Sequence, residues 1–370
     1  MAPASRPLVM LAAGGTGGHL FPAEALAGVL AARGIDVDLV TDSRAARYAG
    51  HFPARKLHVL PAETVRGRSP VALARTALTL GLGFIKGYRL MRAMRPAVVV
   101  GFGGYPTVPP ILAAHYAGLP TLIHEANAVM GRANTLLASR VTAIATGYPD
   151  ICAAKPDLAA KARHTGNPVR PAVIAAAATP FAPLEPGGPL HLLVTGGSQG
   201  ARVMSEVVPL GVEALDPALR ARLRLVQQAR PEDLDSVRAT YARLGVSAKV
   251  EPFFADLPAH IAQAHLVISR SGAMTVAELG VIGRPSLLVP LPGALDQDQL
   301  ANATALATGG GAVVMPQSHF TPESFASAIA RLAGEPGRLE AMAAAARAMG
   351  RADAAERLAA LVLATGNIHV

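Results

Sequence analysis

LVMLAAGGTGGHLFPAEAL (residues 8–26) and LHLLVTGGSQGARVMSEVV (190–208) share one design: an apolar run, a glycine loop and then a helical segment. Apolar runs alternate with helical segments along both halves of the chain, as in AVVVGFGG (97–104) and LVISRSG (266–272). This alternation predicts an α/β fold with parallel sheets covered by helices on both faces. Each of the two stretches is therefore expected to open a Rossmann-like, doubly wound domain, with its ligand crevice at the carboxyl ends of the strands.

The length of 370 residues agrees with two domains of this kind. We expect an N-terminal domain over residues 1–165, a Gly/Pro-rich linker over 166–189 and a C-terminal domain over 190–345. A last helix within 346–370 is expected to pack back on the N-terminal domain. The two domains should face each other across a cleft that holds the active site.

Basic residues are concentrated in the first half of the chain. Residues 1–170 hold 19 Lys and Arg against 8 Asp and Glu, whereas residues 171–370 hold 15 against 17. A basic half attracts phosphate groups, but no RNA-binding motif accompanies it, so no nucleic-acid partner is expected. The single cysteine, Cys152, excludes an intrachain disulfide and fits a reducing compartment. No signal peptide and no apolar run of membrane-spanning length is found, so no transmembrane segment is expected.

Three glycine loops follow apolar runs: GGTGGH (14–19), GFGGYPT (101–107) and GGSQG (196–200). The first fails the G-x-G-x-x-G dinucleotide pattern and lacks the Gly-Lys-Ser/Thr of a phosphate-loop NTPase. Glycines allow the backbone to approach a ligand closely, and the helix that follows offers free N–H groups to an anion. Each loop taken alone is also compatible with a tight turn. Three together indicate two phosphate-bearing ligands and therefore a transfer reaction.

Two polar segments in the second half are candidate sugar and nucleoside contacts. In SRSGAMTVAELG (269–280), the carboxylate of Glu278 can accept two hydrogen bonds from a ribose diol, or it can be an ordinary helical glutamate. In LPGALDQDQLANA (291–303), polar side chains suit sugar hydroxyls or, alternatively, a polar loop and helix cap; they are Asp296, Asp298, Gln299 and Asn302.

The stretch VALARTALTLGLGFIKGYRLMRAMR (71–95) joins an apolar segment to a basic one. Its apolar part, 76–85, is too short to span a membrane, and Lys86, Arg89 and Arg92 follow at intervals of three. Apolar surface beside a basic face is typical of a helix that lies on an anionic membrane surface. A buried helix with a solvated basic end remains the alternative.

Seven motifs in this order resemble one family over residues 8–365: GGTGGHLFPA, GFGGYPT, HEANAVMG, GNPVR, GGSQGA, SRSGAMTVAE and DQDQLANA. They are similar to those of the MurG family, the inverting GT-B N-acetylglucosaminyltransferases of peptidoglycan synthesis. The resemblance implies transfer from UDP-N-acetylglucosamine to the 4-hydroxyl of the undecaprenyl-linked acceptor Lipid I. It also implies a peripheral position on the cytoplasmic face of the bacterial inner membrane, a link to cell shape and division, and other cell-wall and division proteins as partners. No cofactor is implied.

The resemblance also implies site residues. His19 is expected to be the catalytic base, with Glu125 and His124 as lesser candidates, and Gly103, Gly104 and Tyr105 are expected on the acceptor side. Expected contacts to the sugar nucleotide or to a diphosphate are Thr16, Gly17, Gly18, Asn127, Arg170, Ser198, Phe254, Ala273, Met274, Thr275, Val276, Ala277, Glu278 and Gln299. Phe254 matches a position that meets uracil through its backbone. Lys86, Arg89 and Arg92 should face the membrane.

Several alternatives stay open at this point. His19 can take the proton, hold a phosphate or be structural, because a helix N-terminus lowers the basicity of histidine. The chain departs from the family at Asp298 and Ala126, where glutamine is common, so the sugar contact is carried to Gln299 rather than to Asp298. The spacing of Asp296 and Asp298 resembles a metal motif, but no metal site is expected there. The rival functions are another GT-B transferase that moves a UDP-sugar to a lipid, and a non-catalytic UDP-sugar-binding regulator.

Overall fold

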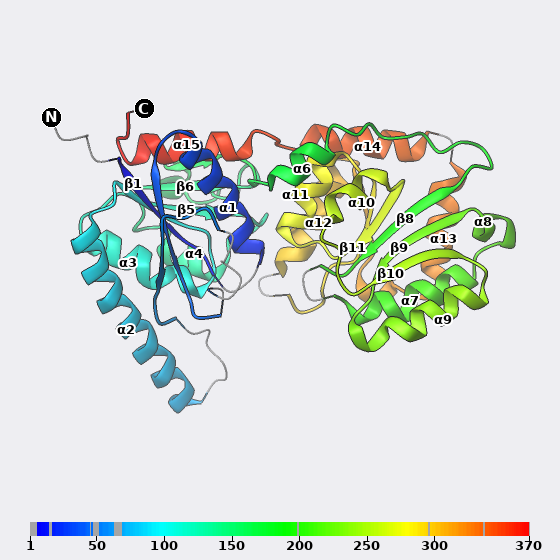
Figure 1. The fold of residues 1–370 in the computed structure, drawn as a ribbon, viewed down its shortest axis with the longest axis horizontal. Helices are drawn as coiled ribbons and strands as arrows, with labels where there is room; N and C mark the ends of the chain where they lie inside the picture. Colours follow the sequence, from blue (N-terminus) through cyan, green and yellow to red (C-terminus); the bar gives the residue numbers. More distant parts are fainter. Residues whose placement is uncertain are drawn as a thin grey trace. The chain divides into compact units, whose positions relative to one another are not determined.

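The computed structural model describes residues 6–14, 17–44, 46, 52–62, 69–197, 200–294, 297–335 and 337–369. The chain forms two compact units (Figure 1): unit 1 comprises Met1–Arg170 with Ala352–Val370, and unit 2 comprises Pro171–Arg351. The expected linker over 166–189 is therefore shared between the two units, and the chain returns to unit 1 six residues later than the expected boundary at 345/346.

Unit 1 contains a seven-stranded, all-parallel sheet in the order β3-β2-β1-β4-β5-β6-β7. Its strands are β1 (Leu8–Ala12), β2 (Asp36–Thr41), β3 (Lys56–Val59), β4 (Val98–Gly101), β5 (Thr121–Glu125), β6 (Ala143–Thr146) and β7 (Ala162–His164). The order reverses between β1 and β4, which is the switch point of a doubly wound fold. The loops after these two strands are two of the glycine loops.

Helices cover both faces of this sheet. They are α1 (Gly17–Ala32), α2 (Pro70–Met94), η2 (Tyr105–Thr107), α3 (Val108–Tyr116), α4 (Arg132–Leu137), α5 (Pro156–Ala159) and α15 (Ala354–Thr365). Alternate strand residues face opposite sides: Val9 and Leu11 pack against α1 and α15, whereas Met10 and Ala12 pack against α2, α3 and α4. The C-terminal helix is thus part of the core of unit 1.

Helix α1 contains a proline beyond its first turn. Proline suits a first helical turn, because it lacks the N–H that a first turn leaves unused. The helix begins at Gly17, so Pro22 lies inside it and removes one helical hydrogen bond. This start places His19 in the first turn.

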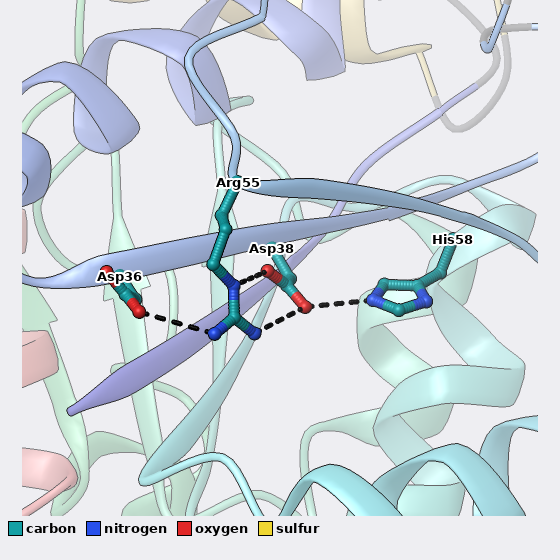
Figure 2. Close-up of polar contacts among 4 residues, drawn as sticks. All are labelled: Asp36, Asp38, Arg55 and His58. Carbon is teal, nitrogen blue, oxygen red and sulfur yellow. Dashed lines mark hydrogen bonds and ion pairs between the residues drawn. The ribbon is translucent and has the colours of Figure 1, made fainter. Parts of the chain in front are cut away.

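The edge strand β3 is fixed to β2 by a buried carboxylate (Figure 2). Asp38 accepts hydrogen bonds from Arg55 (Nε to Oδ1, 3.0 Å) and lies 2.9 Å from Nε2 of His58, while Arg55 also bonds Asp36. Burial by itself raises the pKa of Asp38, but the bonds from Arg55 and His58 outweigh it and hold that pKa below its ordinary value. The sequence interpretation did not identify this cluster.

Unit 2 repeats the topology with a six-stranded parallel sheet in the order β10-β9-β8-β11-β12-β13. Its strands are β8 (Leu190–Thr195), β9 (Leu223–Gln228), β10 (Ser247–Glu251), β11 (Leu266–Ser269), β12 (Ser286–Leu288) and β13 (Ala312–Val314). The switch point lies between β8 and β11. The two repeated stretches, 8–26 and 190–208, therefore occupy equivalent positions in the two sheets.

The helices of unit 2 are α6 (Pro171–Ala176), α7 (Arg202–Glu213), α8 (Pro217–Ala221), η3 (Pro231–Asp233), α9 (Leu234–Arg243), α10 (Leu257–Gln263), α11 (Ala273–Ile282), α12 (Asp298–Thr308), η5 (Gln317–His319), α13 (Pro322–Gly334) and α14 (Arg338–Met349). Buried residues of α7, α9 and α13, such as Val208, Tyr241 and Phe325, pack on one face of the sheet. In Figure 1, α10, α11 and α12 lie on its other side.

Two arginines hold residues 177–180 on unit 2. Arg284 is buried and donates hydrogen bonds to the carbonyls of Thr179 (3.0 Å) and Pro180 (3.1 Å), and Arg347 donates to the carbonyl of Ala177 (2.9 Å). Burial lowers the pKa of Arg284 to about 10, so it stays charged at neutral pH. These bonds explain why the second part of the expected linker belongs to unit 2.

Candidate active site

In unit 1 the two glycine loops of the switch point meet at His19. The imidazole lies against the backbone of Gly103 and Gly104, which have φ angles of 83° and 73°. A Cβ atom added at Gly103 would lie 3.4 Å from Cε1 of His19, and one at Gly104 would lie 3.2 Å from Nε2. Glycine therefore serves two needs here, a left-handed backbone and space for the ring.

The segment that was expected on the acceptor side continues directly from these glycines. The hydroxyl group of Thr107 donates a hydrogen bond to the carbonyl of Gly104 (2.8 Å), which closes the short helix η2. Tyr105, the predicted contact, begins that helix and is partly exposed. Gly17 and Gly18 lie in the first turn of α1, and Thr16 lies outside the described residues.

Glu125 ends β5 and organises the loop that follows it. Its Oε1 accepts hydrogen bonds from the backbone N (3.0 Å) and Nδ2 (3.1 Å) of Asn127, and its Oε2 accepts from the backbone N of Gly131 (2.9 Å) and Nδ2 of Asn134 (2.8 Å). The four donors occupy the four lone-pair positions of the carboxylate. This arrangement favours a positioning role for Glu125 over the role of base.

Asn134 is a member of this site that the sequence interpretation missed. It is buried and also donates to the carbonyl of His124 (3.1 Å). A Cβ atom added at Gly103 would lie 3.6 Å from its Nδ2, so Asn134 links the loop after β5 to the glycine pair beside His19. No signal in the sequence singled it out, because Asn134 lies in a short helix that also contains Arg132 and Thr135.

His124 is fully buried and bonds the carbonyl of Gly166 through Nε2 (3.1 Å). Burial lowers its pKa to about 4, so the ring is neutral at pH 7. The next contact along this loop is the bond from Nδ2 of Asn167 to the carbonyl of Ala126 (2.8 Å). These bonds anchor residues 166 and 167 to unit 1. A fully buried, neutral His124 is better suited to holding this backbone in place than to acting as a catalytic base.

Arg170 ends unit 1 and lies over the ring of Phe21, 4.4 Å from its centroid. Phe21 is in α1, half a turn after His19. The cation–π contact holds the guanidinium near the first turn of α1. Unit 1 thus gathers His19, the glycine pair, the Glu125–Asn127 loop and Arg170.

In unit 2 the loop after β8 is held by side chains of the sheet. The backbone N of Gly196 donates to Oε1 of Gln228 (3.1 Å), and the backbone N of Gly197 donates to Oγ1 of Thr195 (3.3 Å). These two amides therefore make hydrogen bonds within unit 2. Ser198 lies outside the described residues.

The start of α11 is linked to the start of α12. Oγ of Ser271 donates to the carbonyl of Gln299 (2.7 Å), and Nδ2 of Asn302 donates to the carbonyl of Ser271 (3.2 Å). Oε1 of Gln299 accepts from the backbone N of Leu291 (3.0 Å), so its amide NH₂ is the part that can serve a ligand. Asp298 accepts from the backbone N of Gln299 (2.7 Å), and Asp296 lies outside the described residues.

The residues expected to line the nucleotide, Ala273, Met274, Thr275, Val276, Ala277 and Glu278, form most of α11. Their exposure alternates: Met274, Val276 and Glu278 are buried, and the other three are partly exposed. The side chains of Met274 and Val276 therefore belong to the core, and only their backbone can meet a ligand. Glu278 is a buried carboxylate in the second turn of the helix.

Phe254 follows β10 and is buried, with its ring 4.9 Å from that of His260. Because the ring is buried, the backbone is the part of Phe254 that can contact a nucleobase. The neighbouring Phe253 is 71% exposed.

Arg270, which the sequence interpretation missed, is buried at the end of β11 and donates to the carbonyls of Val289 and Pro290 (3.0 Å each).

The predicted membrane-facing residues lie on one exposed face of α2. Leu78, Leu82, Ile85, Arg89 and Arg92 follow one another at intervals of four and three, and all are exposed. In Figure 1 the N-terminal half of α2 extends beyond the rest of unit 1.

Along the described part of the chain, no helix is both long and apolar enough to cross a bilayer. Within the same residues, no three His, Cys, Asp or Glu side chains are grouped as metal ligands.

Comparison with known proteins gives the family. Residues 9–146 match the glycosyltransferase family 28 N-terminal domain, and residues 191–358 match the family 28 C-terminal domain. Relatives named UDP-N-acetylglucosamine--N-acetylmuramyl-(pentapeptide) pyrophosphoryl-undecaprenol N-acetylglucosamine transferase occur in Rhodopseudomonas palustris strain HaA2 (62% identity, 98% of this chain and 99% of the relative) and Bradyrhizobium sp. strain BTAi1 (61%, 98% and 99%).

The crystal structure of MurG from Acinetobacter baumannii is 29% identical, with a TM-score of 0.79 over 97% of this chain and 99% of that one. The predicted GT-B fold class is thereby confirmed. With full-length relatives above 60% identity and both domain models matched, the chain belongs to glycosyltransferase family 28 and, within it, to the MurG family.

Proposed function

We propose that this chain transfers N-acetylglucosamine from UDP-N-acetylglucosamine to the 4-hydroxyl of the N-acetylmuramyl-pentapeptide unit of Lipid I, which forms Lipid II and UDP for peptidoglycan synthesis. The observation that carries the proposal is 62% identity, over 98% of this chain, to a transferase whose name states this donor and this acceptor. The glycine loops at both switch points support it, because doubly wound sheets bind ligands there.

The reaction places two demands on the protein. The bond from the anomeric carbon to the diphosphate oxygen breaks while a β-1,4 bond to the acceptor oxygen forms, with inversion. The acceptor hydroxyl must lose a proton, and the departing UDP must be stabilised as an anion.

His19 is our proposed base. It lies in the first turn of α1, against the glycine pair expected on the acceptor side, and imidazole is a common proton acceptor near neutral pH. A well-placed base contributes about 10²–10⁴-fold to such a reaction. Contact with a phosphate is the alternative role for His19, and the two roles affect kcat and KM differently. Glu125 acts through Asn127, which we propose as a contact to the transferred sugar.

Arg170 and the segment that contains Ser198, before α7, are proposed to stabilise the leaving diphosphate. Each preorganised donor of this kind contributes about 3–4 kcal/mol in a transition state. Glu278 is proposed to bind the ribose diol and Gln299 the sugar. This chemistry uses protein groups alone, so we propose that neither a metal nor a cofactor is required.

The acceptor carries a polyprenyl chain, so the enzyme must work at a bilayer surface. We propose that the exposed face of α2 rests on anionic lipid at the cytoplasmic face of the inner membrane, as a peripheral contact. Other cell-wall and division proteins are natural partners at that location.

The test is a direct product assay. The purified protein is incubated with UDP-N-acetylglucosamine and a short-chain Lipid I analogue, with and without EDTA. We expect one added N-acetylhexosamine by mass spectrometry in both samples. Donor binding without any product would contradict the proposed function. Loss of product only with EDTA would contradict the metal-independent mechanism.

A further inference from the structure

The amide side chain of Gln228 joins the carboxyl ends of three strands in unit 2. Gln228 is the last residue of β9 and is 8% exposed. Its Oε1 accepts hydrogen bonds from the hydroxyl group of Thr195 (2.9 Å) and from the backbone N of Gly196 (3.1 Å). Its Nε2 donates to the carbonyl of Pro252 (3.2 Å), just after β10.

The orientation of this amide is fixed by its partners. A backbone N–H can only donate and a carbonyl can only accept, so the oxygen of Gln228 must face Gly196 and its nitrogen must face Pro252. The hydroxyl of Thr195 then points its proton at Gln228 and accepts from the backbone N of Gly197 (3.3 Å). The result is one continuous chain of hydrogen bonds in which every polar group has a defined role.

This chain connects the two segments that are proposed to hold opposite ends of the donor. Gly196 and Gly197 begin the GGSQG loop, which is assigned to the diphosphate. Pro252 immediately precedes Phe253 and Phe254, and the backbone of Phe254 is expected to contact the uracil of the donor. We propose that Gln228 is a positioning residue of the donor site, which sets the spacing between the diphosphate loop and the nucleoside segment. The proposal rests on the location of the donor site given under the proposed function.

Gln227 supplies a matched control on the same strand. It is also fully buried, and its side chain accepts a hydrogen bond from the hydroxyl of Tyr241 and donates to the carbonyl of Met204 (3.3 Å). Successive side chains of a strand point to opposite faces. Loss of the Gln227 amide therefore removes a buried polar network of similar kind that does not reach Pro252 or the GGSQG loop.

The experiment compares Gln228→Met with Gln227→Met in the full-length protein. Measurements are the Kd of UDP by calorimetry, the KM values of donor and acceptor, and the melting temperature. We expect both variants to lose thermal stability. Only Gln228→Met should raise the Kd of UDP and the donor KM, by about tenfold or more, as expected when a buried hydrogen-bonding group is lost. The acceptor KM should stay within about twofold of the wild-type value.

Thr195→Val provides a second route to the same hydrogen-bond chain. It should also raise the Kd of UDP. In the double variant of Gln228→Met and Thr195→Val, the fold increase in the Kd of UDP should be smaller than the product of the two single increases. An unchanged Kd of UDP in a folded Gln228→Met protein, or in Thr195→Val if the first does not fold, would overturn the proposal. An equal rise in Gln227→Met would also do so. Failure of the wild-type protein to bind UDP would instead overturn the donor-site assignment itself.

Discussion

At the residue scale, the backbone at Gly104 determines where the imidazole of His19 can lie. Gly104 and Gly118 have nearly equal φ angles of 73° and 72°, but an added Cβ meets His19 at 3.2 Å in the first case and nothing within 4 Å in the second. We expect Gly118→Ala to lose about 1–2 kcal/mol of stability, because it places alanine at a positive φ. We expect Gly104→Ala to lose more, because a φ of 73° with a ψ of 160° lies in a region that is essentially restricted to glycine. Only Gly104→Ala should lower kcat, by about tenfold to a hundredfold, because it displaces the ring.

Denaturant unfolding and steady-state kinetics on both variants check this expectation. Gly118→Ala is the control for backbone strain without contact to His19. A Gly104→Ala enzyme that is destabilised but keeps the wild-type kcat would show that the position of the imidazole against this loop has no bearing on the reaction.

The kinetics of His19→Gln distinguish the two roles considered for His19, proton acceptor and phosphate contact. Glutamine can still donate a hydrogen bond to a phosphate but cannot take the proton. If His19 is the base, we expect kcat to fall by about 10²–10⁴-fold with the substrate KM values little changed. The acid limb of the pH–rate profile should also disappear. A raised KM with kcat preserved would instead assign His19 to a phosphate.

His124 makes stability depend on pH. Its folded-state pKa is about 4, below the value of about 6.5 for an exposed histidine. Between these two pH values His124 is therefore protonated in the unfolded chain but neutral in the folded chain. Stability should therefore fall as pH drops from about 6.5 towards 4, with a loss of about 2 kcal/mol at pH 5 from this residue. His124→Gln keeps a donor for the carbonyl of Gly166 and removes the titration.

We expect the free energy of unfolding of His124→Gln to fall less between pH 7 and pH 5 than that of the wild type, as measured by urea titration. Parallel losses in the two proteins would mean that other groups account for the acid sensitivity. The comparison isolates one histidine because every other titratable residue is common to both proteins.

At the element scale, α2 combines tight packing on one side with exposure on the other. Gly87 faces Ala113 of α3, where an added Cβ would lie 3.2 Å from the alanine side chain. The opposite face carries Leu78, Leu82 and Ile85, followed by the basic residues. We expect reversal of Lys86, Arg89 and Arg92 to Glu to weaken binding to anionic vesicles by about a hundredfold or more, at about 1 kcal/mol for each lost attraction.

Sedimentation with vesicles at increasing salt measures this effect, and wild-type binding should also weaken as salt rises. The control is charge reversal at Arg224, Arg331 and Arg338, which are exposed in unit 2 and change the net charge equally. Equal losses of vesicle binding in the two triple variants would show that binding depends on net charge and not on this face of α2.

The elements also show what sequence can and cannot predict. Strand, glycine loop and helix recur twice, and this local pattern was sufficient to predict two doubly wound domains. The partners of buried polar groups were not predicted, because they depend on the order of strands in the sheet and on the path of loops. Gln228 meets Pro252 through the sheet order, and Glu125 meets Asn134 through a loop.

At the scale of the whole molecule, the residues proposed for different parts of the reaction lie in different units. The proposed base and the acceptor-side loop belong to unit 1, and the proposed ribose and sugar contacts, Glu278 and Gln299, belong to unit 2. UDP alone should therefore interact mainly with unit 2. Arg170 is the exception, because it is the last residue of unit 1 and is proposed to meet the diphosphate.

Hydrogen exchange read by mass spectrometry tests this division in the intact protein. We expect saturating UDP to slow exchange in residues 195–202 and 270–279, because bound ligand opposes the local opening that exchange requires. Residues 101–107 and 124–131 should exchange at the same rate with and without UDP, and should respond instead to a Lipid I analogue. Slowed exchange at 101–107 with UDP alone, and none at 270–279, would reverse the assignment of donor and acceptor to the two units.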